Sequence, residues 1–283
     1  MAQFHVDKPA NFLEVREALT LSTWMYYFGK GQETATNVAF NYCFGPNNVP
    51  PHYVDDMVKE HMDSNILIDH FVSDPGCGLT MAIFFANKKI YVAFGGVEYR
   101  ELKDFFSPVQ TAQDDLGNDI RVHHGFNFIL QKHMTGIMTA LRGIQTRHAG
   151  AEIVITGHGL GGALSTLMGY YAAKDMPKST IRVVSFAAPR VGNDAFRRAH
   201  DNMANLTHTR VVNKRDISVT MWVDDATYAQ VGNFVVHLTG KNVVNHYHRY
   251  SYPEGFFSVA KCFNLADHFC IGYWSNLENR PEW

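Results

Sequence analysis

The chain has 283 residues, of which 46% are hydrophobic and 18% charged, and its formal net charge at pH 7 is -2. This composition is typical of a folded globular protein and excludes intrinsic disorder. Because the net charge is small and no run of five or six like charges occurs, we expect neither a nucleic-acid partner nor an anionic membrane surface.

The longest apolar stretches, residues 79–86 and 90–94, have the length of strands. A bilayer-spanning helix needs about 20 apolar residues, so we expect no transmembrane segment. The first 15 residues lack the apolar core of a secretory signal, which favours an intracellular protein. Four cysteines are present without a C-x-x-C pair or a zinc-finger spacing, and we therefore expect buried free thiols, no metal site and no cofactor.

The N-terminal part, from about residue 11 to 44, is predicted to be helical and to pack on a single domain that spans residues 1–283. No internal repeat, low-complexity tract or flexible linker divides the chain. Three strands are predicted next, at 66–72, 79–86 and 90–94. The last two are joined by the polar residues 87–89, a connection typical of an antiparallel hairpin.

From residue 123 onward the pattern predicts helices that alternate with strands, and the fold class is therefore α/β with a mixed, mostly parallel sheet. Apolar residues recur at helical spacing from Phe126 to Ile144 and again from Leu160 to Tyr171. Further helices are predicted at 194–203 and 265–274, and further strands at 152–156, 181–186, 209–212, 234–238 and 256–261.

The stretch ITGHGLGGAL, residues 155–164, matches two different motifs. Gly157-x-Gly159-x-x-Gly162 has the spacing of a loop that holds a dinucleotide pyrophosphate. That interpretation also needs an acidic residue at the end of the next strand, and residues 185–190 contain none. The second motif is the nucleophile turn G-x-S-x-G of hydrolases, with glycine in place of the serine.

Six segments make the second interpretation specific, and they occur in a fixed order: residues 90–96, 122–126, 153–163, 186–193, 210–216 and 267–273. In these segments the chain resembles the class 3, or fungal-type, lipases, a subfamily of the α/β hydrolases. The resemblance runs from about Thr34 to Trp274. It implies an α/β-hydrolase fold in which a strand, a tight turn and a helix present the nucleophile.

Carried over position by position, the resemblance places the triad acid at Asp216, the base at His268 and the nucleophile at Gly159, which has no side chain. It also places the two oxyanion positions at Val97, where the family has serine or threonine, and at the backbone N–H of Leu160. Gly95 stands where the family has arginine, and residues 217–221 lack the prolines that usually follow the acid.

Two functional hypotheses follow from these departures. In the first, the protein is a lipase-like pseudoenzyme that acts as a binding or structural component, with a lipid or acyl ligand in its vestigial cleft or with protein partners, including copies of itself. In the second, it is an active triacylglycerol lipase or carboxylesterase whose serine was replaced at Gly159, or a hydrolase in which His268 and Asp216 activate water directly. A metal site at His246-x-His248 is a weaker alternative, because no carboxylate or thiol stands near it in the sequence.

Overall fold

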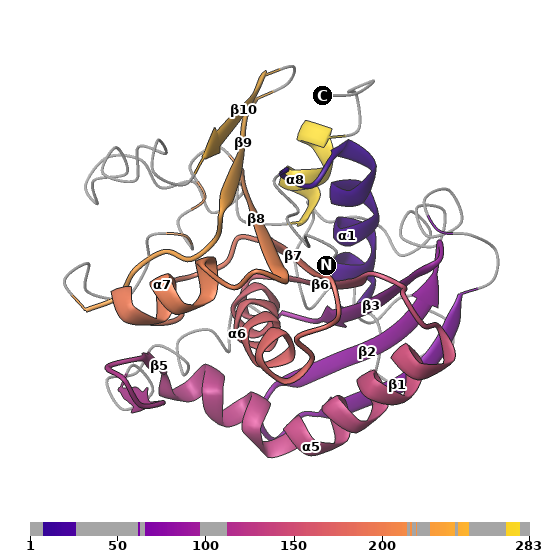
Figure 1. The fold of residues 1–283 in the computed structure, drawn as a ribbon. Helices are drawn as coiled ribbons and strands as arrows, with labels where there is room; N and C mark the ends of the chain where they lie inside the picture. Colours follow the sequence, from indigo (N-terminus) through magenta and orange to yellow (C-terminus); the bar gives the residue numbers. More distant parts are fainter. Residues whose placement is uncertain are drawn as a thin grey trace.

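The computed structural model describes residues 8–26, 62, 66–96, 112–213, 216, 219, 227–240, 243–248 and 270–277. An eight-stranded sheet forms the centre of this part of the chain, with the strand order β1-β2-β3-β6-β7-β8-β9-β10 (Figure 1). The strands are β1 (Leu67–Asp74), β2 (Leu79–Ala86), β3 (Lys89–Phe94), β6 (Ile153–His158), β7 (Ile181–Phe186), β8 (Leu206–Asn213), β9 (Phe234–Gly240) and β10 (Val243–His248).

The five central strands, from β3 through β6, β7 and β8 to β9, pair in parallel. The outer strands β1, β2 and β10 pair in the antiparallel sense. A second, two-stranded sheet consists of β4 (Gln113–Asp115) and β5 (Arg121–His123). Since the parallel strands all end at one edge of the sheet, the loops that follow them are brought together at that edge.

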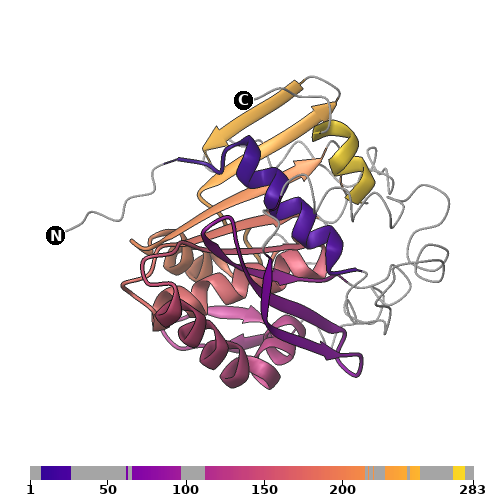
Figure 2. The same ribbon diagram turned by 90° about the vertical axis from the view of Figure 1, so that its right-hand side faces the viewer.

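Helices cover both faces of the large sheet (Figures 1 and 2). Packed on one face are α5 (His124–Arg147), α6 (Leu160–Asp175) and α7 (Asp194–Asp201), and on the other face are α1 (Phe12–Trp24) and α8 (Cys270–Leu277). Successive residues of β3 show this division, since Ile90, Val92 and Phe94 join the core under α5 and α6, whereas Tyr91 and Ala93 join the core under α1. This double burial explains why the strand sequence shows no alternation of polar and apolar residues.

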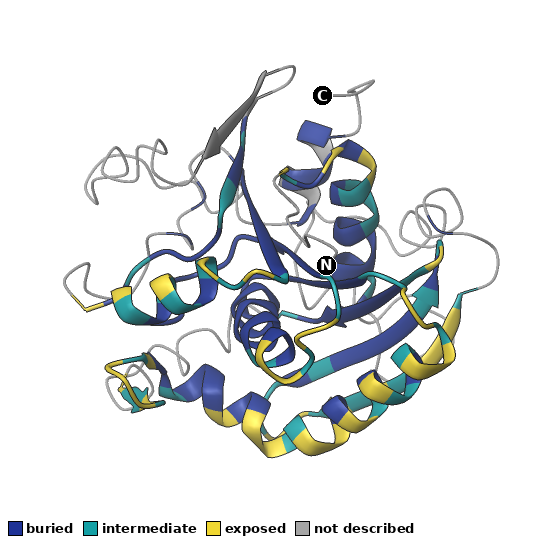
Figure 3. Ribbon diagram, in the orientation of Figure 1, coloured by how far each residue is buried: buried dark blue, intermediate teal, exposed yellow. Residues whose placement is uncertain are grey.

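Helix α6 is the most buried helix of the described part of the chain, and α5 lies outside it with one face exposed to solvent (Figure 3). All residues of α6 from Leu160 to Tyr170 are buried. A helix that is apolar on every side is expected inside a large domain, where it packs between a sheet and other helices. The turn that precedes α6 is therefore held rigidly from several directions.

Several predictions from the sequence are confirmed within one or two residues, among them β2, β3, β7 and the alternation of helices and strands after residue 123. The hairpin between β2 and β3 turns at Asn87 and Lys88, both with positive φ (49° and 60°), the conformation of a two-residue type I′ turn. The single-domain interpretation of residues 1–283 stays a prediction.

Other boundaries differ from the predictions. The N-terminal helix is described only over Phe12–Trp24, and residues 27–61 lie outside the described part. The same holds for the predicted strand at 256–261. The last described helix runs from Cys270 to Leu277 and ends three residues beyond the predicted range 265–274, of which residues 265–269 lie outside the described part. Strands β4, β5 and β10 were not predicted. None of the helices in the described ranges combines the length and apolar character needed to cross a membrane.

Candidate functional site

A single residue, Gly159, connects β6 to α6. Strand β6 ends at His158 and α6 begins at Leu160, and Gly159 has φ 59° and ψ -120°. Its N–H donates to the carbonyl oxygen of Phe186 at the end of β7, with an N···O distance of 2.9 Å. Glycine adopts such a positive φ without the strain that a β-carbon causes. Glycine therefore fits the backbone conformation at the summit of this turn without strain.

The neighbouring glycines allow the first turn of α6 to lie directly on the strand ends. A β-carbon at Gly157 would overlap the carbonyl group of Gly161, and one at Gly161 would stand 2.5 Å from the carbonyl oxygen of Phe94. One at Gly162 would stand 2.8 Å from the carbonyl oxygen of Phe186. The connection is one residue long, and protein backbone occupies the space where a β-carbon of each neighbouring glycine would stand. It therefore lacks the loop that encloses a pyrophosphate. The geometry therefore does not favour the dinucleotide interpretation.

The close packing at Gly161 gives a testable expectation. Gly161→Ala places a methyl group against two buried carbonyl oxygens, those of Phe94 and Gly95, and we expect it to lower the free energy of unfolding by about 3 kcal/mol. Urea denaturation measures this change. The matched control is Gly136→Ala on the exposed side of α5, where the β-carbon meets no atom within 4 Å and where we expect a gain of about 0.5–1 kcal/mol. Equal stabilities of the two variants would contradict the packing.

Asp216 follows β8 and is buried, with 1% of its surface exposed. Its N–H donates to the carbonyl oxygen of Asn213 at 2.9 Å, and its Oδ2 accepts from the hydroxyl of Tyr273 in α8 at 2.6 Å. Burial, together with the negative charge of Asp216, raises the pKa of Tyr273 far above its ordinary range. The phenol therefore stays protonated at neutral pH and donates to Asp216.

The ring of Tyr273 connects the Asp216 segment to the turn at Gly159. It packs edge-on against His158, with ring centroids 5.6 Å apart, and against Phe186 at 5.9 Å. On the other side of His158, the hydroxyl of Tyr26 lies 2.8 Å from Nδ1. Tyr26 also packs on Gly96, where a β-carbon would overlap its hydroxyl.

Tyr273 joins the Asp216 segment to the turn, and Tyr26 joins the turn to Gly96 after β3. Neither role was predicted. Tyr273 appears in the sequence only as part of the motif around His268, and nothing in the sequence near Tyr26 indicates a partner 132 residues away. Contacts of this kind arise from the packing of α1 and α8 on the sheet.

The remaining predicted positions divide into two groups. Leu160 is buried and is the first residue of α6, so its N–H belongs to the first turn of the helix and has no acceptor within that helix. Val97 and His268 lie outside the described residues, as does the side chain of each histidine in His246-x-His248. The structure thus brings together the turn at Gly159, Leu160 and the segment that carries Asp216.

Two of the four cysteines lie in the described part. Cys77 is partly buried, Cys270 is fully buried, and both are free thiols. Burial raises the pKa of Cys270 to about 12, so this thiol is protonated and unreactive at neutral pH. Both observations agree with the expectation of free thiols, while Cys43 and Cys262 lie outside the described residues.

The same region of the chain is similar to known proteins. Residues 92–224, from β3 to beyond the Asp216 segment, match the family model described as Lipase (class 3). Phospholipase A1-II 3 of Oryza sativa subsp. japonica is 37% identical over 94 residues, which cover 30% of this chain and 22% of the relative. Secreted mono- and diacylglycerol lipase 1 of Fusarium solani is 32% identical over 136 residues, which cover 47% of this chain and 40% of the relative.

A solved structure extends the likeness to nearly the whole fold. Lipase II from Rhizopus niveus superposes with a TM-score of 0.71, covering 91% of this chain and 92% of that one, at 16% sequence identity. This chain is a class 3 lipase-like protein. Its fold is that of the α/β hydrolases, as the sequence predicted, with a mostly parallel sheet covered by helices on both faces.

The likeness in sequence is narrower than the likeness in fold. Matches of this class 3 lipase-like protein span from about a fifth to two fifths of the length of those two curated relatives. The part that matches the family model includes Gly159 and Asp216 but not His268.

Proposed function

We propose that this class 3 lipase-like protein is a pseudoenzyme, a hydrolase scaffold that has no esterase activity and acts in binding. The observation that carries the proposal is the residue at the turn between β6 and α6. In the proposed correspondence, Gly159 occupies the nucleophile position, with φ 59° and ψ -120°, and it offers no oxygen or sulfur atom to attack an ester.

A catalytic triad divides the reaction among three side chains. A serine hydroxyl attacks the ester carbonyl, a histidine takes its proton, and an acid orients the histidine. We propose Asp216 for the acid and His268 for the base. The burial of Asp216 and its hydrogen bond from Tyr273 support the first assignment. Without a nucleophile, these two residues have no hydroxyl proton to transfer.

The proposed oxyanion site also departs from a complete one. We assign one donor to the N–H of Leu160 at the start of α6, where the helix dipole favours negative charge. The second position falls on Val97, whose side chain cannot donate a hydrogen bond. Loss of a single oxyanion donor lowers kcat by roughly 10²–10³. The loss of the nucleophile and the loss of an oxyanion donor are independent, and together they support an inactive scaffold better than either loss alone.

As a binding component, the protein would hold a lipid or acyl ligand in a vestigial cleft, which is part of the proposal. The names of the two relatives described above, a phospholipase and a lipase, support this class of ligand. Binding to protein partners and self-assembly are further parts of the same proposal.

The test is an assay of ester hydrolysis by the chain as given, with short and long p-nitrophenyl acyl esters. We expect turnover indistinguishable from a heat-denatured sample, and no labelling by a serine-reactive phosphonate. Binding is measured separately with a fluorescent fatty acid, for which we expect saturable uptake. Robust turnover, or phosphonate attached within residues 155–164, would contradict the pseudoenzyme proposal.

The second candidate is an active ester hydrolase whose serine was replaced, or one that activates water with His268 and Asp216. It is favoured by the retained environment of Asp216, because a buried carboxylate with a 2.6 Å hydrogen bond from Tyr273 is costly to keep without use. Water activation predicts slow turnover that Asp216→Asn abolishes. A pseudoenzyme shows no turnover in either form.

A further inference from the structure

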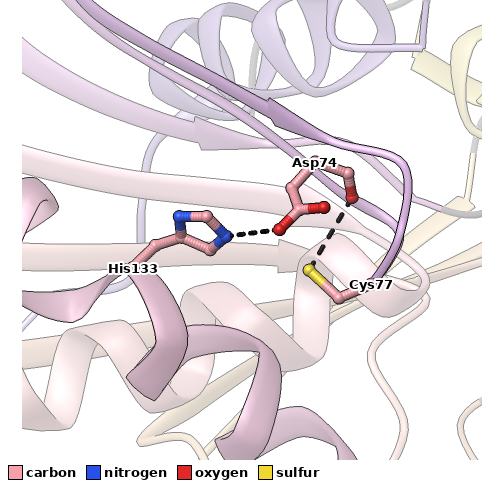
Figure 4. Close-up of side chains that lie close together, drawn as sticks. All are labelled: Asp74, Cys77 and His133. Carbon is pink, nitrogen blue, oxygen red and sulfur yellow. Dashed lines mark hydrogen bonds and ion pairs between the residues drawn. The ribbon is translucent and has the colours of Figure 1, made fainter.

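A separate cluster of metal-ligating side chains lies where the β1–β2 turn meets α5. Asp74 ends β1, Cys77 lies in the turn, and His133 reaches across from α5 (Figure 4). The carboxylate oxygen, the Sγ and an imidazole nitrogen of these residues all lie within 4.8 Å of one another. It is the one such group of three found among the described residues.

The turn holds Asp74 and Cys77 in fixed positions. The Cys77 N–H donates to the Asp74 carbonyl oxygen at 3.2 Å, and the Gly76 N–H donates to Asp74 Oδ1 at 3.1 Å. This leaves Oδ2 directed toward α5, where it lies 2.8 Å from His133 Nε2. The carboxylate is thus oriented by one oxygen and presents the other to the histidine.

The types of these three side chains identify the class of ion. Thiolate, imidazole and carboxylate together are ligands of Zn²⁺, whereas Mg²⁺ and Ca²⁺ select oxygen atoms alone. Ligand atoms around a tetrahedral zinc ion lie about 3.5 Å apart. All three side chains are partly buried at the protein surface. To enclose the ion, separations of up to 4.8 Å must shorten, and the 2.8 Å between His133 Nε2 and Asp74 Oδ2 must lengthen.

We propose that Asp74, Cys77 and His133 form a site for Zn²⁺ or a similar divalent cation, with water as the fourth ligand. On binding, the metal takes the place of the hydrogen bond between His133 and Asp74. The Sγ proton of Cys77 and the Nε2 proton of His133 pass to solvent, and the neutral imidazole then carries its one proton at Nδ1. The site is independent of the turn at Gly159 and of the proposed function there. It differs from the expectation of no metal site, which rested on sequence spacing.

The position of Lys132 predicts in which direction its substitution changes the affinity for zinc. Its Nζ lies 2.7 Å from Asp74 Oδ2, the same oxygen that the metal needs, and half of its side chain is exposed. A lysine in this position competes with the cation for the carboxylate. Lys132→Ala should therefore tighten zinc binding, a change that a purely structural ion-pair cluster does not produce.

The experiment titrates the full chain, freed of metal with a chelator, with ZnCl₂ in a calorimeter and with Co²⁺ in a spectrophotometer. We expect saturation near one equivalent and a cobalt–thiolate charge-transfer band. Cys77→Ser should remove the band, and Cys77→Ser and His133→Gln should each weaken zinc binding at least about 10-fold. Far-ultraviolet circular dichroism confirms that each variant is folded.

A matched control is available on the same helix. His124 Nδ1 lies 2.8 Å from Asp114 Oδ1, a histidine–aspartate pair like that of His133 but outside the cluster. His124→Gln should leave zinc affinity unchanged. The proposal is overturned if the chain shows no saturable binding, if affinity survives both Cys77→Ser and His133→Gln, or if Lys132→Ala weakens binding.

Discussion

Gly159→Ser is expected to give this class 3 lipase-like protein an esterase activity that the chain as given lacks. The new hydroxyl would stand at the summit of the β6–α6 turn, and, in the proposed assignment, His268 and Asp216 would activate it. Loss of a nucleophile costs roughly 10⁶ in kcat, and a missing oxyanion donor costs roughly 10²–10³. We therefore expect a kcat about 10²–10³-fold below that of a complete triad and at least about 10³-fold above that of the chain as given, which lacks the same oxyanion donor, measured with p-nitrophenyl esters.

Gly159→Ala separates chemistry from backbone strain. Alanine and serine both place a β-carbon at φ 59°, so both variants should lose about 1 kcal/mol of stability, but only serine supplies a nucleophile. If the serine variant folds as well as the alanine variant and is equally inactive, position 159 is not the nucleophile position of a working triad.

The double variant Gly159→Ser/Val97→Ser then examines the oxyanion position. Restoring a hydroxyl at residue 97 should raise kcat by a further factor of roughly 10²–10³. Full lipase-like activity in Gly159→Ser alone, with no gain from residue 97, would instead favour the second candidate, an otherwise complete enzyme that lacks only its serine.

Much of the centre of the fold could be predicted from the sequence because its signals are local. The β-branched run at 181–186 appears as β7, covered on both faces, and Asn87-Lys88 forms the tight hairpin that a polar connection predicts. The glycines at 157, 161 and 162 indicate a tight strand-to-helix junction, and each has a backbone carbonyl where a β-carbon would stand.

Other features depend on contacts between distant segments, which leave no local signal. The edge strand β10 was not predicted, because its polar residues (Asn245, His246, His248) lack the apolar pattern of a central strand. The hydrogen bond from Tyr273 to Asp216 joins residues 57 positions apart, and that between His133 and Asp74 joins residues 59 apart. Only the packing of α8 and α5 on the sheet reveals these partners.

Acidification from pH 7 to pH 5 is expected to lower the free energy of unfolding by about 4 kcal/mol through two buried histidines, His123 and His200, and further through a third, His208. Burial lowers the pKa of His123 to about 4. The pKa of His208 falls well below 6.5, because of burial first and then of the charges on His200 and Arg210. At pH 5 the ring of His123 remains neutral in the folded chain and protonation of His208 is disfavoured there, whereas their unfolded counterparts, with a pKa of 6.5, take up protons.

The sign follows from proton counting. Between pH 6.5 and pH 5 the unfolded chain binds more protons than the folded one, so stability falls as the pH falls, by about 2 kcal/mol at pH 5 for each of His123 and His200. His200, whose pKa burial lowers to about 3 although Asp201 lies 3.0 Å from its Nδ1, acts in the same direction. The lowered pKa values of Asp114 and Asp194 change the free energy of unfolding only below about pH 4, since the ordinary pKa of these groups is 3.8.

Urea denaturation at pH 7, 6 and 5 and constant ionic strength measures this dependence, and two variants assign it. His208→Gln removes one titrating group and should reduce the loss of stability at pH 5. Gly136→Ala changes stability without changing any titrating group, so its pH dependence should match that of the unmodified chain. A His208→Gln variant with the full pH dependence would mean that the imidazole is protonated in the folded state, in contradiction to its burial between Ser185 and His200.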